Sequence, residues 1–202
     1  MMKSIELSLE ELRKISIKAA CEITNDNSID LIIYVARAGY PIALYMNEVM
    51  KCKMLGIGAT RKGNKLKALL GPLVSGMPGF IRNSLIQLEL TTKIHKKKRD
   101  RQVHFLEPID ESKHASVKNI LIVDDSVDTG YSMRDVIRYV QQEFKDCKVI
   151  TYALNVWDMS KEILTIDYCT YENTIIQAPM SKDSKEYNRF CALYEEAIQK
   201  YM

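Results

Sequence analysis

The sequence lacks the long apolar segments and the paired cysteines that define several classes of protein. None of its hydrophobic runs approaches the roughly 18 residues of a membrane span, and residues 1–6 have no apolar signal-peptide core. The five cysteines are scattered, odd in number and without the spacing of metal ligands. We therefore expect buried free thiols in a reducing compartment and a cytoplasmic protein.

Length and composition are typical of one soluble globular domain. The 202 residues can bury a substantial core, and 47% hydrophobic with 27% charged residues is an ordinary balance. We predict a single domain over residues 1–202, with a basic accessory or lid segment inserted at about residues 61–118.

Positive charge is concentrated in the middle of the chain. Residues 61–104 contain eleven Lys or Arg and two acidic residues, a net charge of +9, whereas the whole chain carries +3. Such a segment attracts a polyanion, either a phosphorylated small molecule or nucleic acid. A solvated surface run would have the same composition, so the charge alone does not choose between these roles.

Residues 119–132 combine a buried strand, two carboxylates and a turn rich in hydroxyl groups. Residues 120–123 are branched and apolar, which predicts a strand buried on both faces. Asp124 and Asp125 follow, and the next turn has one glycine, Gly130, before a helix over 133–144 that Ser132 or a neighbour can cap. Amides at a helix N-terminus bind phosphate, and paired acids suit ribose hydroxyls or Mg²⁺. The stretch predicts a site for a phosphorylated sugar or nucleotide; an ordinary strand-to-helix turn with solubilising acids is the alternative.

The motif Ile-Val-Asp-Asp-x-x-Asp-Thr-Gly-x-Ser at residues 122–132 resembles the phosphoribosyl pyrophosphate (PRPP) signature of the type I phosphoribosyltransferases. In layout the chain is similar to the xanthine–guanine and hypoxanthine enzymes of that family. The resemblance implies that Asp124 and Asp125 hold the ribose hydroxyls and a Mg²⁺ ion. It also implies that PRPP is bound by the turn residues Ser126, Asp128, Thr129, Gly130, Tyr131 and Ser132.

Two further loops resemble the pyrophosphate-binding parts of the same family. Arg37-Ala38-Gly39 follows a predicted strand over residues 31–36 and resembles a loop often written Arg-Gly-Gly, with Ala38 in place of the middle glycine. Its backbone amides would hold pyrophosphate, and a helix of about ten residues begins at Pro41. Arg61 and Lys62 follow a strand over 54–59 and stand where the family has a basic residue that reaches pyrophosphate. A basic turn without that role has the same sequence.

Strands and helices alternate along the rest of the chain. A capping-box pattern at Ser8–Glu11 predicts a helix to about Thr24, residues 148–156 a strand, 168–178 one or two strands, and 184–202 a terminal helix. The pattern predicts an α/β fold with a doubly wound parallel sheet, in which ligands bind beyond the carboxyl ends of the strands. Residues 66–118 fit several structures. The resemblance implies a flexible basic loop there, a small hood or accessory helical element, and a returning arm over 102–106.

Residues 173–179 are similar to the base-binding segment of the xanthine–guanine enzymes, which implies base contacts by Asn155, Ile175 and Ile176. Ile175 replaces an aromatic residue that stacks on the base, and Asn155 replaces a lysine that recognises a 6-oxo group. An aliphatic side chain can sandwich a base, and an amide can pair with an amide-like edge. Trp157 and Tyr152 are either replacement stacking surfaces or packing residues.

The resemblance implies Mg²⁺-dependent displacement of pyrophosphate from C1 of PRPP by a nitrogen of a purine or related base, through an oxocarbenium-like transition state. Asp128 stands where the family has a base that takes the proton from the purine ring; hydrogen bonding to the phosphate-loop amides is the alternative. We expect small-molecule partners, a homodimer and no membrane. The alternative function is a PRPP-sensing regulator that binds nucleic acid through the basic segment. That segment lacks interleaved aromatic residues, so we do not expect nucleic acid as a partner.

Overall fold

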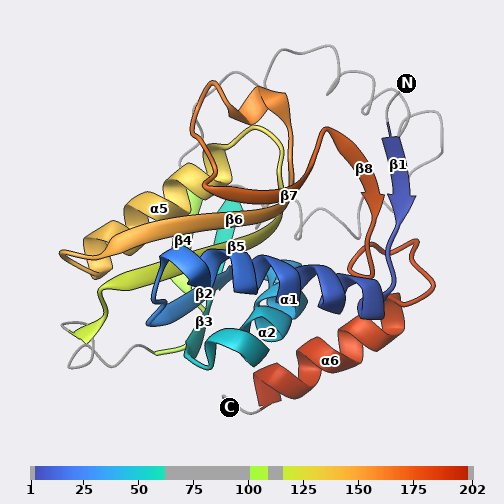
Figure 1. Ribbon diagram of the computed structural model, residues 1–202, viewed down its shortest axis with the longest axis horizontal. Coiled ribbons are helices and arrows are strands. Elements are labelled where there is room, and N and C mark those ends of the chain that lie inside the picture. The colour runs from blue at the N-terminus through green and yellow to red at the C-terminus, as the bar shows by residue number, and fades with distance from the viewer. Residues whose placement is uncertain (1–2, 62–100, 109–115, 200–202) are drawn as a thin grey trace, which may run out of the picture. The chain divides into compact units, whose positions relative to one another are not determined.

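The computed structural model describes residues 3–61, 101–108 and 116–199 (Figure 1). The strands are β1 (Lys3–Glu6), β2 (Leu31–Val35), β3 (Lys53–Arg61), β4 (Arg101–Phe105), β5 (Asn119–Val127), β6 (Lys148–Val156), β7 (Tyr168–Glu172) and β8 (Thr174–Gln177). The helices are α1 (Leu9–Asp26), α2 (Gly39–Met50), α5 (Tyr131–Glu143), α6 (Tyr187–Gln199) and the short 3-10 helix η3 (Asp158–Ser160).

The chain divides into two compact units. One comprises residues 1–59 and 103–202, and the other comprises residues 60–102. The second unit lies almost entirely outside the described residues. The predicted insertion at about 61–118, with its basic loop and helical element, therefore stays a prediction.

Six strands form the main sheet in the order β4-β3-β2-β5-β6-β7. The pairs from β3 to β7 are parallel, and Ile33 of β2 lies opposite Leu55 of β3 and Ile122 of β5. β4 runs antiparallel to β3, because Leu106 N donates to Gly56 O (2.9 Å) while His104 packs at Gly58. The predicted α/β fold with a doubly wound, mostly parallel sheet is confirmed.

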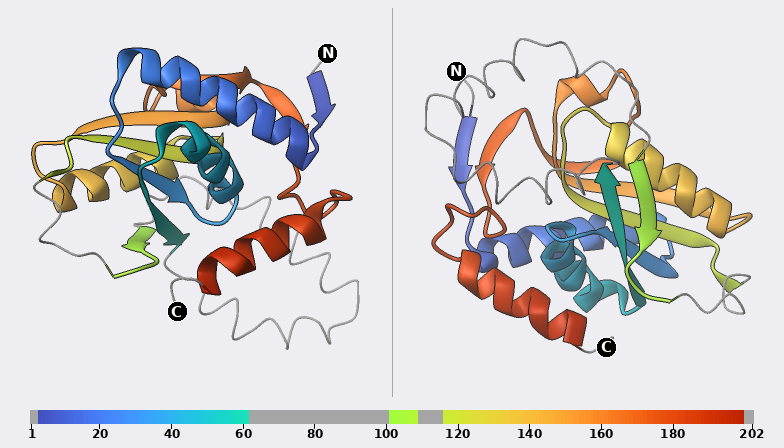
Figure 2. Two further views of the ribbon diagram at one scale, coloured as in Figure 1. Left: turned by 60° about the horizontal axis from the view of Figure 1, so that its bottom comes forward. Right: turned by 180° about the vertical axis from the view of Figure 1, so that it is seen from behind.

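Both faces of this sheet are covered by apolar packing, as the continuous hydrophobic runs of the strands predict. Ile32 and Tyr34 of β2 point into a core shared with α1, α2 and α6. The alternate residue Ile33 packs with Val136 and Val140 of α5 in a second core. Figure 2 shows α1 and α2 on one side of the sheet and α5 on the other.

Local sequence signals place several element ends. The capping box of α1 is confirmed, since Ser8 Oγ accepts from Glu11 N (3.2 Å) and the Glu11 carboxylate accepts from Ser8 N (2.8 Å). The strand predicted over residues 148–156 has the bounds of β6. α2 begins at Gly39, two residues before the predicted start at Pro41.

Two predictions around the acidic motif were wrong in detail. β5 does not end before Asp124, because the ladder with β6 continues to the pair Val127 and Val156. The prediction that Ser132 or a neighbour caps the next helix is also wrong. α5 begins at Tyr131, and its N-cap is Gly130, which makes no side-chain cap. Ser132 lies within the first helical turn.

The N-terminal strand β1 was not predicted. It pairs in parallel with β8 in a separate two-stranded sheet, where Ile5 lies opposite Ile176. β1 is only four residues long and carries two charged side chains, so it has no strand signature of its own. None of the described helices is long and apolar enough to cross a membrane.

Candidate functional site

The strand order reverses between β2 and β5. From β2 the chain continues through α2 to β3 on one side, and from β5 it continues through α5 to β6 on the other. In an open α/β sheet such a reversal opens a crevice at the carboxyl ends of the two strands, and ligands bind there. The loops that follow β2 and β5 are the two loops that the sequence singled out.

These two loops touch at Gly39. A Cβ atom at this position would lie 2.7 Å from the carbonyl oxygen of Val123 and 3.6 Å from the Cα of Asp124. Because the obstacle is backbone of a central strand, only glycine lets the loop after β2 approach so closely. The peptide bond between Ala36 and Arg37, at the start of this loop, is cis. The predicted pyrophosphate loop therefore lies directly against the predicted ribose-binding acids.

The turn after β5 is shaped by Gly130, which has a φ of 76°. A Cβ atom there would lie 2.5 Å from Cδ2 of Leu164 and 3.2 Å from the carbonyl oxygen of Ser160, so the segment after β6 packs directly on the turn. Since no side chain caps α5, the first N–H groups of this helix remain a favourable place for an anion. The start of α5 therefore presents backbone N–H groups that no side chain caps, which is a feature of anion-binding helix starts.

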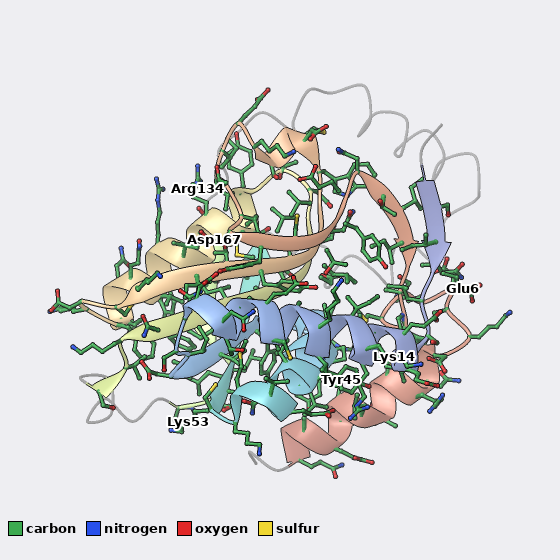
Figure 3. The ribbon with its side chains drawn as sticks, viewed as in Figure 1. Glu6, Lys14, Tyr45, Lys53, Arg134 and Asp167 are labelled. Atoms are coloured by element: carbon green, nitrogen blue, oxygen red, sulfur yellow. The ribbon has the colours of Figure 1, made fainter. Side chains whose placement is uncertain are left out.

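The first turn of α5 carries one cation close to this turn. The Arg134 guanidinium lies 4.9 Å from the centre of the Tyr131 ring and makes an ion pair with Asp135 (2.9 Å) (Figure 3). Tyr131 is exposed, whereas both partners of the ion pair are partly buried. Arg134 is held by its own helix, and its charge adds to the positive end of the helix dipole.

The two acids of the motif stand where a negative charge is costly. Asp124 is only 7% exposed, and its Oδ1 accepts a hydrogen bond from the backbone N of Asp125 (2.9 Å). Burial, and next the charge of Asp125, raise the pKa of Asp124 well above its ordinary value. Burial also raises the pKa of the Asp125 carboxyl. A bound cation would remove this penalty, so the pair is suited to a cationic or hydroxyl-bearing ligand.

The donor set fits Mg²⁺ bound together with a substrate. In the described part of the chain, no group of three or more His, Cys, Asp or Glu side chains could hold a metal by itself. Mg²⁺ typically uses one or two carboxylates and completes its shell with water and substrate phosphates. Asp124 and Asp125 supply carboxylates of that kind.

Asp128, the predicted proton acceptor, is exposed at the start of the turn. The Ser126 hydroxyl donates to its Oδ1 at 2.7 Å. This hydrogen bond fixes the Asp128 carboxylate next to Ser126, while its second oxygen has no hydrogen bond among the described contacts. Thr129 is exposed beside it, so both side chains can meet a ligand.

A pocket of about 230 Å³ opens beside the acidic motif. It is lined by Asp125, Ser126, Leu154, Asn155, Trp157, Thr174, Ile175, Ile176, Ala178 and Ser181. The lining is largely apolar with a few hydroxyl and amide groups, as is usual for a small-molecule pocket. Asp125 and Ser126 belong both to the acidic motif and to this pocket, so the two predicted subsites are continuous.

Asn155 lies in the pocket wall but is held by the backbone of Thr174. Its Nδ2 donates to the Thr174 carbonyl (2.9 Å), and its Oδ1 accepts from the Thr174 N–H (3.3 Å). Asn155 is buried and ties β6 to β8, leaving one amide N–H and one lone pair for any ligand. Ile175 is 49% exposed and Ile176 is partly buried, and both line the pocket.

The structure separates the two aromatic candidates. Trp157 lines the pocket, so it can contact a ligand. Tyr152 is buried in the core, and its hydroxyl pairs with Thr170 Oγ1 (2.7 Å). Burial raises the pKa of Tyr152 to about 12. Tyr152 is therefore a packing residue.

The structure tests little of the prediction that Arg37, Arg61 and Lys62 contact pyrophosphate. Arg61 is the last residue of β3, and Lys62 lies outside the described residues. The Arg37 guanidinium lies over aromatic rings of α6, a contact that the sequence did not predict. Thr174 and Ser181 were also missed as pocket residues. Ser181 follows β8 in a turn whose path depends on tertiary packing, so no local signal could have identified it.

Comparison with known proteins shows what this arrangement resembles. A family model described as the phosphoribosyl transferase domain matches residues 5–183. The comparison with curated proteins gives no match. The regulatory alternative finds no support in the comparisons.

Three solved structures have a similar fold. A purine phosphoribosyltransferase from Pyrococcus horikoshii has a TM-score of 0.60 at 17% identity, with 91% of this chain and 97% of that chain covered. A xanthine-guanine-hypoxanthine phosphoribosyltransferase from Helicobacter pylori has a TM-score of 0.63 at 17% identity, with 92% and 99% covered. A hypothetical protein from Neisseria gonorrhoeae with bound ppGpp has a TM-score of 0.58 at 15% identity, with 98% of each chain covered.

At such identities these likenesses establish the fold alone, and the family model carries the assignment. It spans the loop after β2, the acidic motif and most of the pocket wall. The chain therefore belongs to the phosphoribosyl transferase family of glycosyltransferases.

Proposed function

We propose that this protein transfers the phosphoribosyl group of PRPP to a ring nitrogen of a purine or related base and releases pyrophosphate, with Mg²⁺ as cofactor. The observation that carries the proposal is the shared position of Asp125 and Ser126. They belong to the motif that would hold the ribose, and they also line the apolar pocket. A base in that pocket would have its nitrogen next to the ribose, which is the proximity that the displacement requires.

Each part of the crevice would then have one role. Asp124 and Asp125 would bind the ribose hydroxyls, and the turn from Ser126 to Ser132 would bind the 5-phosphate through its amides. The amides of residues 37–39 would receive the pyrophosphate, together with the basic residues Arg61 and Lys62. Mg²⁺, held by the acid pair and the substrate, would neutralise charge on the leaving pyrophosphate.

Asp128 is the proposed general base. Its carboxylate accepts a hydrogen bond from Ser126, which lies in the pocket wall, and this link to the pocket supports the proposal. Taking the ring proton as the new bond forms would prevent positive charge from building up on the base.

A purine or related base suits the pocket and its neighbours. A volume of about 230 Å³ is below the roughly 300–1,000 Å³ of typical ligand pockets, which fits a single base better than a whole nucleotide. No cationic side chain is among its lining residues in the described part of the chain. Recognition would rest on stacking by Ile175 and Trp157 and on the remaining hydrogen-bonding capacity of Asn155. The printed names of two similar structures, both purine enzymes, support the same class.

The test measures pyrophosphate release from PRPP in the presence of Mg²⁺ and a panel of purine and pyrimidine bases. We expect release with at least one base, and loss of at least about 100-fold in the variant Asp124→Asn/Asp125→Asn, since both ribose and metal contacts disappear. Glu48→Gln is the matched control, because Glu48 forms only an exposed ion pair with Arg13. PRPP binding without turnover of any base would contradict the transferase and favour a binding protein. The cytoplasmic location and the homodimer stay predictions.

A further inference from the structure

The side chain of Arg37 is occupied by the C-terminal helix. Its guanidinium carbon lies 5.6 Å from the ring centre of Phe190 and 5.3 Å from that of Tyr194, both on α6. Its Nη2 also donates to Sγ of Cys191, at 3.5 Å. Phe190 and Tyr194 are four residues apart and therefore share one face of the helix. Arg37 begins the predicted pyrophosphate loop, so α6 contacts that loop from a distance of about 150 residues along the chain.

The receiving surface on α6 is preformed. Phe190 is 2% exposed and Tyr194 is 5% exposed, and their rings are stacked at 6.2 Å. A guanidinium over buried aromatic rings is held by the electrostatic attraction between the cation and the ring faces, and this attraction increases as water is excluded. Both rings also pack on other aromatic side chains, Phe190 on Tyr187 and Tyr194 on Tyr40, so Arg37 is one of several contacts that they make.

A second contact joins α6 to the same loop. The Tyr194 ring meets the Tyr40 ring edge-on at 5.5 Å, and Tyr40 in turn meets Tyr34 of β2 at 5.2 Å. Tyr40 lies in the first turn of α2, and its N–H donates to the Arg37 carbonyl (3.2 Å). The loop is therefore attached to α6 at both of its ends.

The opposite side of the loop rests on β5. Gly39 has no room for a Cβ atom because the Val123 carbonyl oxygen would be 2.7 Å away. Figure 1 shows α6 alongside α2, on the side of the main sheet that α1 and α2 cover. Tyr45, labelled in Figure 3, lies farther along α2 and packs against the core cluster that contains Phe190 and Tyr194. The loop is thus held between a central strand and the C-terminal helix.

We propose that α6 sets the geometry of the pyrophosphate loop, with Phe190 and Tyr194 as positioning residues. Arg37 is then an anchor for the loop, and the main-chain amides of residues 37–39 are the groups presented to pyrophosphate. This inference rests on the proposed function, and it adds a role for the Arg37 side chain to the backbone contacts that the sequence predicted. For that side chain to bind pyrophosphate, it would have to leave two aromatic rings and a thiol.

The test compares pyrophosphate and ribose 5-phosphate binding, each measured by calorimetry with Mg²⁺, in ring variants of α6. Tyr194→Leu removes the aromatic face but keeps apolar volume, and we expect pyrophosphate to bind roughly 3- to 10-fold more weakly, as loss of one cation–π contact implies. Tyr194→Phe keeps the ring and should stay within about twofold of wild type. Ribose 5-phosphate affinity should change by less than about twofold in both, because no contact between the turn after β5 and α6 is found in the described part of the chain.

Two further variants separate positioning from general damage. Tyr187→Leu is the control, since Tyr187 packs on Phe190 (6.0 Å between ring centres) and makes no contact with Arg37 in the described structure. Arg37→Ala and Tyr194→Leu both remove the cation–π contact between Arg37 and Tyr194, and Tyr194→Leu also removes the ring contact with Tyr40. The combined variant should therefore lose less pyrophosphate affinity than the product of the two single losses.

The outcome that overturns the inference is a loss of about 100-fold or more in Arg37→Ala with unchanged binding in Tyr194→Leu, which would make Arg37 a direct ligand. Equal weakening by Tyr187→Leu and Tyr194→Leu would also overturn it, because helix packing alone would then be responsible. If wild type binds ribose 5-phosphate but no pyrophosphate, this inference fails while the acid-pair site stands. If wild type binds neither ligand, the proposed function itself fails.

Discussion

The two loops of the crevice are built in different ways. The proposed ribose-phosphate side, residues 124–132, is one continuous stretch of strand, acids, turn and helix start. The proposed pyrophosphate side, residues 37–39, depends on two segments far away in the sequence, β5 behind Gly39 and α6 behind Arg37. The binding groups of the first loop come from one segment, although β6 and the residues after it also pack on that segment. The second loop is held by two distant segments.

This difference has consequences for how each loop responds to mutation. A local motif fails mainly when one of its own residues changes. A loop held by tertiary contacts also loses function when a distant residue changes. Such a change moves the loop but leaves its own binding groups intact. Substitutions on each side should therefore weaken the binding of different ligands. The two loops can then be compared by measuring the affinity for each ligand separately.

The largest effect is expected for Gly39→Ala. The new methyl group would lie 2.7 Å from the Val123 carbonyl oxygen, so the loop must move away from β5. We expect activity to fall about 100-fold, as displacement of a binding group by about 1 Å can cause. Stability should fall by about 1–3 kcal/mol, as in other overpacked sites.

Steady-state kinetics and urea denaturation measure these two effects. The control is Ala43→Gly on the same helix, which also alters a small buried residue but leaves the loop in place. Wild-type pyrophosphate affinity in Gly39→Ala would show that the close approach to β5 is not needed for binding.

The next effect is expected for Gly130→Ala on the ribose-phosphate side. Alanine is strained at a φ of 76°, and its methyl group would lie 2.5 Å from Leu164 Cδ2. Because the clash is with a side-chain end that can shift, we expect a stability loss of about 1–2 kcal/mol, mainly from the backbone strain. Ribose 5-phosphate should bind about 10-fold more weakly while pyrophosphate affinity stays close to wild type.

Calorimetry with each ligand separately tests this selectivity. The double variant Gly130→Ala/Leu164→Ala should recover part of the binding if the side-chain clash contributes, and none if the backbone alone matters. Equal loss of both ligands would mean that the two loops are one coupled unit, and the comparison between them would break down.

The same difference explains what the sequence could predict. Sequence patterns identify features that depend on residues close together in the chain. Such features are the acidic motif, the capping box at Ser8 and the bounds of β6. The prediction of an α/β fold succeeded because continuous apolar runs such as that of β5 require cover on both faces. The predicted end of β5 was wrong. Acidic residues such as Asp124 and Asp125 are typical of turns, but pairing with β6 keeps these two residues in the strand.

The contacts that the sequence missed are all long-range. The residues next to Arg37 in the sequence do not indicate that it stacks on α6. The residues next to Asn155 do not indicate that the Thr174 backbone hydrogen-bonds to both the nitrogen and the oxygen of its side-chain amide. The pairing of β1 with β8 likewise joins the two ends of the chain. Such contacts are determined by the fold as a whole. The sequence accordingly predicted that residues 37–39 form a loop after a buried strand, but it did not predict the contacts that hold this loop; its role in pyrophosphate binding stays a prediction.

A smaller effect, on stability, is expected for Asp124→Asn. The raised pKa of Asp124 means that the folded state binds its proton more tightly than the unfolded chain does. The free energy of unfolding therefore decreases as the pH rises from 3.8, the ordinary pKa, to the raised pKa of the folded state. The lost stability is not regained at neutral pH. Asparagine keeps the Oδ1 acceptor for Asp125 N and removes the charge.

We expect Asp124→Asn without ligand to be more stable than wild type at pH 7 by on the order of 1 kcal/mol, or about 2–4 °C in Tm. The difference should shrink as the pH falls towards 4, where wild type becomes protonated. Thermal unfolding across this range measures it, with Asp158→Asn as the control because its pKa is lowered by Lys161. A wild type that gains stability over the variant as the pH rises would contradict the cause assigned to the shift.

The smallest effect is expected for Ala38→Gly, which restores the glycine that similar loops carry. Ala38 has an ordinary right-handed conformation (φ −74°, ψ −27°), so its methyl group causes no strain and glycine relieves none. Glycine adds freedom to the unfolded chain, which should cost about 0.4–1 kcal/mol of stability. Pyrophosphate affinity should stay within about twofold of wild type, because the amide at residue 38 is still fixed between β5 and the contacts with α6. A gain of tenfold or more in affinity would show that the Ala38 methyl group obstructs the ligand, and the loop would then be shaped by its own sequence, as the ribose-phosphate side is.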